Sequence, residues 1–113
     1  MQIIFESRDG DGAKMRDLSI ERVRFVLRRL SAFVPRAKVQ FSDVNGPRGG
    51  VDKRCQVELN TATAGTVVIA SMASDWRTAL NRSLGRASRV LVRSLRRNQK
   101  PTRGREVRLA LDS

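Results

Sequence analysis

A row of basic side chains in the C-terminal third of the chain has the spacing of a single helix face. At about 100° per residue the row falls within a stripe about 80° wide. Its members are Arg82, Arg86, Arg89, Arg93, Arg96 and Lys100. Guanidinium groups form forked hydrogen bonds with phosphate, so a row of this composition is typical of a surface that binds a nucleic-acid backbone. We call this set the arginine stripe.

The charge balance around the stripe distinguishes nucleic-acid binding from two alternatives, a solvated helix face and a membrane surface. Residues 76–105 contain ten basic side chains and no acidic one, and the whole chain has a net charge of +12. A solvated helix face usually alternates in sign, because like charges three or four residues apart repel. A membrane surface is the weaker alternative, since the leucines opposite the stripe are needed for a core and only Trp76 resembles an interfacial anchor. Nucleic acid is therefore favoured over a solvated face.

Further basic residues extend the candidate RNA-binding set beyond the stripe. The segment DVNGPRGGVDKRC, residues 43–55, is rich in glycine and lies between two predicted strands, which is typical of a long hairpin connection. It lacks the helix and the GK[ST] motif that follow a phosphate-cradling loop, but its basic side chains remain candidates for backbone contacts. The additional candidates are Arg22, Arg28, Arg29, Arg48, Lys53 and Arg54.

The residues that most catalytic and metal sites require are scarce. The chain has no histidine and a single cysteine, Cys55, which argues against histidine-ligated metals and against any mechanism that needs an imidazole base. Asp9 and Asp11 lack the third ligand and the glycine of a calcium loop, so helix capping explains them better. We expect that the protein is not an enzyme and that it has no cofactor, no metal site and no small-molecule substrate.

Hydrophobic periodicity predicts the elements that would position these side chains. Segments 2–7, 37–44, 53–60 and 66–73 have the pattern of strands. A long amphipathic helix is predicted from Ala13 to Val34, and a second helix follows the cap formed by Ser74 and Asp75. The order β-α-β-β-β-α predicts an α+β fold, with a four-stranded sheet and both amphipathic helices on one face.

Chain length and segment polarity suggest the domain organisation. The 113 residues suffice for one domain, which we assign to residues 1–97, followed by a flexible tail at residues 98–113. The N-terminus lacks the pattern of a signal peptide, and the longest apolar run, TVVIASMA, is far shorter than the roughly 18 residues of a membrane span. We expect a cytoplasmic protein without a membrane partner. The few aromatic residues are expected in the core, which disfavours a stacking platform for single-stranded RNA.

The start of the last helix resembles a known family. In the ribosome hibernation-promoting factor and ribosome-associated inhibitor family, the last strand is followed by an aspartate, an aromatic residue, an alanine and an aliphatic residue, and then by basic residues at helical spacing. The matching positions here are Asp75, Trp76, Ala79, Leu80, Arg86, Arg89 and Arg93. The resemblance extends over residues 1 to about 97. The sequence departs from the family in placing Trp76 one position early, in having Asn81 and Gly85 where acids are frequent, and in its longer NGPRGG loop.

The resemblance carries its own functional expectations. Such proteins bind the small ribosomal subunit against rRNA, in the channel used by mRNA and tRNA, and inhibit translation under stress or in stationary phase. The dimerisation domain of the long family members has no counterpart in this sequence, so ribosome dimers are not implied and the free protein is expected to be a monomer. The partners implied are the small ribosomal subunit and its rRNA.

Two other functions remain open from the residues alone. A generic double-stranded RNA-binding module also ends in β-β-β-α with a basic helix, although such a helix usually begins with lysines rather than with Ser74, Asp75 and Trp76. A small enzyme is the other possibility, and it would have to rely on Cys55.

Overall fold

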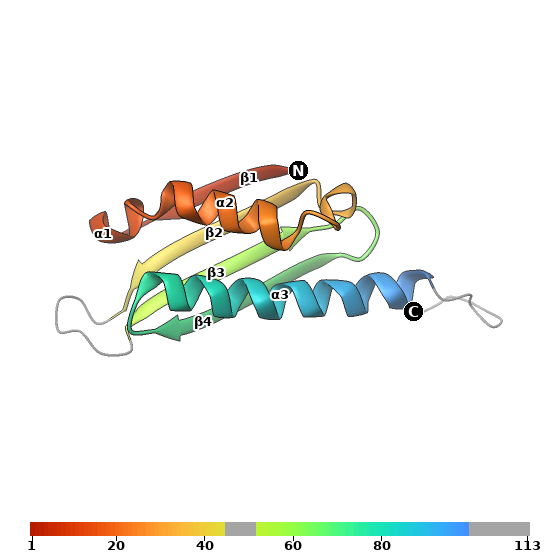
Figure 1. Ribbon diagram of the computed structural model, residues 1–113. Coiled ribbons are helices and arrows are strands. Elements are labelled where there is room, and N and C mark those ends of the chain that lie inside the picture. The colour runs from red at the N-terminus through yellow and green to blue at the C-terminus, as the bar shows by residue number, and fades with distance from the viewer. Residues whose placement is uncertain (45–51, 100–113) are drawn as a thin grey trace.

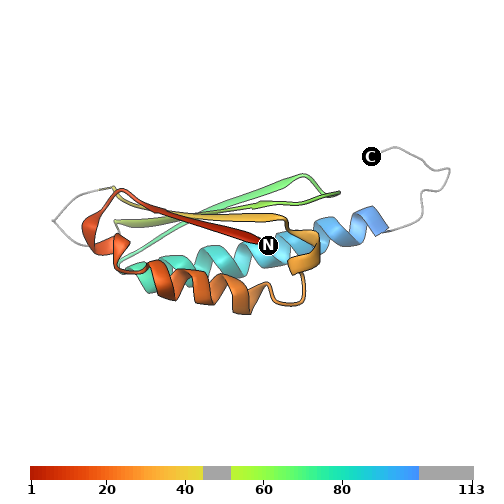
Figure 2. The ribbon, with the colours of Figure 1, turned by 90° about the horizontal axis from the view of Figure 1, so that it is seen from above.

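A single mixed sheet organises the computed structural model, which describes residues 1–44 and 52–99. Its strands are β1 (Gln2–Ser7), β2 (Arg36–Asp43), β3 (Lys53–Asn60) and β4 (Thr66–Ala73), in the order β1-β2-β3-β4 (Figure 1). β1 pairs with β2 in parallel, and the other two pairings are antiparallel. Helices α2 (Arg16–Val26) and α3 (Trp76–Gln99) lie on the same side of the sheet (Figure 2). The predicted fold class and element order are confirmed.

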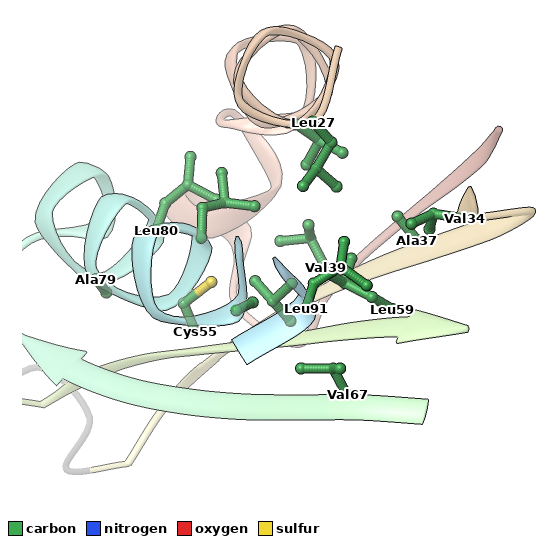
Figure 3. Close-up of a cluster of buried hydrophobic side chains, with 14 of the residues drawn as sticks. Leu27, Val34, Ala37, Val39, Cys55, Leu59, Val67, Ala79, Leu80 and Leu91 are labelled. Atoms are coloured by element: carbon green, nitrogen blue, oxygen red, sulfur yellow. The ribbon is translucent and has the colours of Figure 1, made fainter. Parts of the chain in front are cut away.

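The core lies between this helical layer and the sheet. Alternation along the strands directs one set of side chains toward the helices, and α3 buries an apolar stripe against them. Figure 3 shows these side chains converging from both layers. The fully buried strand and helix residues include Ala37, Val39, Phe41, Cys55, Val57, Leu59, Leu80 and Leu91. The alternation predicted for β2 and β3 is therefore confirmed.

The prediction of one continuous helix from Ala13 to Val34 is wrong. The chain forms a single-turn helix α1 (Gly10–Ala13), then α2, then the 3-10 turn η1 (Ser31–Phe33). A continuous helix of that length would measure about 33 Å, whereas the six residues of β1 span about 20 Å. Because β2 is parallel to β1, the connection must return the chain to the start of the sheet, and the shorter α2 matches that distance.

The aspartate before α1 acts as a helix cap, as the sequence predicted for this segment. The Oδ1 atom of Asp9 accepts hydrogen bonds from the backbone N–H groups of Asp11, at 2.8 Å, and Gly12, at 3.2 Å. The site also needs glycine, since a Cβ atom at Gly12 would lie 2.5 Å from Ser7 Oγ and 3.3 Å from Phe41 Cβ. The short helix thus brings its backbone against the end of the sheet.

The cap predicted for the last helix is also present. Asp75 precedes α3, and its carboxylate accepts hydrogen bonds from the Thr78 backbone N–H, at 2.9 Å, and from the Thr78 hydroxyl, at 2.7 Å. Trp76, the first residue of α3, is buried and stacks on Phe41 with ring centroids 4.8 Å apart. The helix continues to Gln99, past the predicted domain boundary at residue 97, and the rest of the predicted tail lies outside the described residues.

The Asp75 cap predicts a pH-dependent stability. The two hydrogen bonds from Thr78 lower the pKa of Asp75. A carboxyl whose folded pKa is lowered stabilises the fold above its unfolded pKa of about 3.9, and that contribution is lost as the pH falls through the folded value. We expect Asp75→Ala to lower the urea midpoint at neutral pH and to have a smaller effect in strong acid. Urea unfolding of both proteins at the two pH values measures this. An effect of equal size at both would contradict the role of the carboxylate.

Candidate nucleic-acid interface

The arginine stripe runs along α3 on the side away from its buried apolar residues. Ser83 marks the sheet side, because it is buried and its Oγ donates a hydrogen bond of 2.7 Å to the carbonyl of Cys55 on β3. The stripe residues that the structure describes are all exposed, namely Arg82, Arg86, Arg89, Arg93 and Arg96. Lys100 lies outside the described residues. The predicted helical face therefore forms, and it presents its guanidinium groups to solvent.

Part of the stripe lies along the edge of the sheet. Among the strands that the structure describes, β4 stands at the end of the sheet and pairs with β3 alone. Arg82 Nη1 donates a hydrogen bond of 3.0 Å to the Met72 carbonyl, and Arg86 Nη1 lies 3.4 Å from Ser71 Oγ. With Arg89, these side chains line an open groove between β4 and α3. The contacts hold the two arginines in place, which reduces the entropy lost when they bind a phosphate.

The charges of the stripe are not neutralised within the part of the chain that the structure describes. The ion pairs found there join Lys14 to Asp11, Arg16 to Asp17, Lys38 to Glu6, and Lys53 to Asp43 and Asp52. None of these pairs includes a residue of α3. A helix that places like charges three and four residues apart without compensating acids loses a few tenths of a kcal/mol per pair. That cost is offset when an anion binds.

A second group of basic side chains lies on α2 and just after it. Arg28 and Arg29 are exposed, and Arg22 is half-buried. The guanidinium carbons of Arg22 and Arg28 lie 5.6 and 4.3 Å from the centroid of the Phe25 ring. Phe25 is 55% exposed and Phe33 is 39% exposed, so the expectation that the aromatic residues lie in the core is wrong for these two. The sequence did contain a signal, because Phe25 falls about 200° from the buried Val23 on the helical wheel.

Lys53 and Arg54, the described candidates near the glycine-rich segment, do not join the stripe. The Lys53 ammonium lies 2.7 Å from Asp43 Oδ2 and 3.6 Å from Asp52 Oδ1, and the hydrogen bond that it donates to Asp43 raises the pKa of Lys53. Its charge is thus largely compensated within the protein. Arg54 alternates with the buried Cys55 and so lies on the sheet face opposite the helices. Arg48 lies outside the described residues.

The single cysteine is placed as a core residue. Cys55 is fully buried, and burial raises the pKa of its thiol to about 12. We therefore expect no reaction with a chromogenic disulfide reagent under native conditions, and stoichiometric reaction once urea unfolds the chain. Absorbance of the released thiolate measures both. Rapid labelling of the native protein would show that the thiol is accessible and reactive.

Neither a cluster of metal ligands nor a membrane-spanning helix occurs in the part of the chain that the structure describes. In residues 1–44 and 52–99, no three potential metal ligands of the His, Cys, Asp or Glu type come together. Within these ranges, every helix is too short or too polar to cross a bilayer.

Comparison with known proteins identifies the fold. No protein-family model matches the chain, and no curated protein is significantly similar to it in sequence. A ribosomal subunit interface protein from Coxiella burnetii superimposes with a TM-score of 0.67 at 12% identity, over 85% of this chain and 99% of that one. The N-terminal domain of Protein Y from Thermus thermophilus gives a TM-score of 0.60 at 19% identity, over 82% and 98% of the two chains. The fold expected from the family resemblance is confirmed.

Proposed function

We propose that this protein is a ribosome-associated dormancy factor that binds the small ribosomal subunit through rRNA. One observation carries the proposal: an arginine row without acidic neighbours lies exposed on α3. The fold that presents it is shared with a protein named for the ribosomal subunit interface. A net charge of +12 favours a polyanionic partner and speeds association with it.

The mode of binding follows from the chemistry of the surface. Arginines spaced along one helix face neutralise successive phosphates and release the counterions condensed on the RNA. Such contacts identify the shape of folded rRNA more than its base sequence. Occupation of the mRNA and tRNA channel by this domain would inhibit translation under stress or in stationary phase. In this role the protein acts in the cytoplasm by binding, without catalysis, and exists as a monomer when free.

Co-sedimentation with purified small subunits over a series of salt concentrations tests the proposal. We expect saturable binding near one protein per subunit, with an affinity that falls steeply as salt increases. Competition with mRNA or tRNA then tests whether the channel is occupied. Binding without saturation, equal to that on a bare RNA duplex, would reject a ribosome-specific role and favour the generic double-stranded RNA-binding module.

A further inference from the structure

The surface of α2 carries an aromatic ring where a helix in contact with water usually has a polar side chain. Phe25 is 55% exposed, whereas Phe41 and Trp76 are buried in the core. Its immediate neighbours Arg24, Arg28 and Arg29 are basic and exposed, and Arg22 is half-buried. One exposed apolar residue needs no explanation by itself. The arginines arranged around Phe25, however, do call for an explanation.

The ring and its neighbours form an ordered unit. The guanidinium carbon of Arg28 lies 4.3 Å from the Phe25 ring centroid, and that of Arg22 lies 5.6 Å from it. Arg28 Nη1 also donates a hydrogen bond of 2.7 Å to the Phe25 carbonyl, which fixes the position of the guanidinium. Both distances lie within the roughly 6 Å over which a guanidinium is attracted to the face of an aromatic ring. The result is a partly apolar surface whose neighbours are mostly basic, with one exposed carboxylate, that of Glu21, a turn before the ring.

We propose that Phe25 and Arg28 form a stacking site for one unpaired base of RNA, with Arg22, Arg24 and Arg29 placed to bind the phosphates beside it. The inference rests on the proposed function and deepens it, since it assigns a single-stranded nucleotide to α2 and leaves duplex phosphates to α3. Aromatic rings and guanidinium planes are the groups on which proteins stack splayed RNA bases. Any base can stack there, because every base has a π-face.

The charges around Phe25 favour an RNA nucleotide over an apolar protein surface as the ligand of this ring. A protein partner that simply covered Phe25 would have to desolvate several arginines without compensating them. A nucleotide provides a planar apolar surface for the ring and a phosphate for the arginines in a single ligand. The two helices lie on the same side of the sheet, so one folded RNA can reach both surfaces (Figure 2).

The test compares two RNA probes by fluorescence anisotropy at one salt concentration. One probe is a short labelled oligouridylate, which is unpaired, and the other is a labelled blunt-ended RNA duplex of two strands, which is fully paired. We expect Phe25→Ala and Phe25→Leu to weaken binding of the oligouridylate by roughly 5- to 150-fold, as the removal of a stacking ring does, and to leave duplex binding within about twofold. Arg28→Lys, which keeps the charge but removes the planar group, should also weaken the oligouridylate complex.

A matched control is available on the open face of the sheet. Val68 is 52% exposed, so Val68→Ala removes a comparably exposed apolar side chain away from the arginines and should change neither affinity. Equal reductions on both probes, or no reduction on the oligouridylate, would overturn the stacking site. Co-sedimentation of the wild-type protein with small ribosomal subunits tests the proposed function independently of the stacking site. Failure to sediment with subunits rejects that function even if the oligouridylate results support stacking.

Discussion

Replacing Arg86, Arg89 and Arg93 together with Ala is expected to weaken binding to small ribosomal subunits by about 100- to 1,000-fold. Each side chain is exposed on α3 and lies in a row without acidic neighbours. An effect of this size corresponds to about 2.7–4.1 kcal/mol. It amounts to roughly 1 kcal/mol for each of the three side chains, within the range of about 0.5–1.5 kcal/mol for the net contribution of a hydrogen bond. The slope of log affinity against log salt should also become shallower, by roughly 0.9 for each phosphate that is no longer neutralised.

The same variant should fold at least as well as the wild type. Removing the three charges relieves repulsion at i,i+3 and i,i+4 spacing, and Ala has the highest helix propensity. Urea unfolding followed by circular dichroism should therefore show an equal or slightly higher midpoint. Loss of binding in a destabilised protein would not support the site, whereas loss of binding in a protein of unchanged stability would.

A control variant with the same change in net charge distinguishes a binding site on α3 from the general electrostatic field of the protein. Arg36, Lys38 and Arg54 lie on the sheet face opposite the helices, as their alternation with buried neighbours shows. Replacing all three with Ala removes the same charge from the other side of the molecule. We expect a reduction of less than about tenfold, through the weaker long-range field alone. Equal reductions in the two triple variants would contradict the assignment of binding to α3.

Phe41→Ala is expected to lower the free energy of unfolding by about 3–5 kcal/mol. The Phe41 ring is fully buried, stacks on Trp76 at 4.8 Å and makes a T-shaped contact with Phe5 at 5.3 Å between centroids. It therefore links β1, β2 and the first turn of α3 in one cluster. Domains of this kind have about 5–15 kcal/mol of stability, so the variant should lose a large fraction of it.

Equilibrium urea unfolding measures this effect, and Phe25→Ala serves as its control. Phe25 is the same residue type but more than half exposed, so its removal should change the unfolding free energy by no more than about 1 kcal/mol. The pair thus compares one side chain in two environments. Similar destabilisation at the two positions would mean that the cluster around Phe41 does not have the stabilising role assigned to it.

Local patterns in the sequence were sufficient to predict most of the architecture. Alternation in β2 and β3 predicted which side chains point inward, because a strand has a fixed period of two. The row on α3 was predicted from helical periodicity alone, and the capping of α3 by Asp75 from residue type and position. These features depend on neighbours within a few residues, so no knowledge of the tertiary structure was needed.

Other features depended on distances that the sequence does not contain. Where α2 ends is decided by the short β1 and by the parallel pairing that the connection must satisfy, whereas hydrophobic periodicity alone favoured one longer helix. The ion pair between Lys53 and Asp43 depends on the register of β2 and β3, which places these two residues opposite each other. Residue type and spacing therefore determined that this protein presents an arginine row. Only the packing of two helices on one face of the sheet decided which other basic side chains share its side of the molecule, because that depends on contacts between segments far apart in the chain.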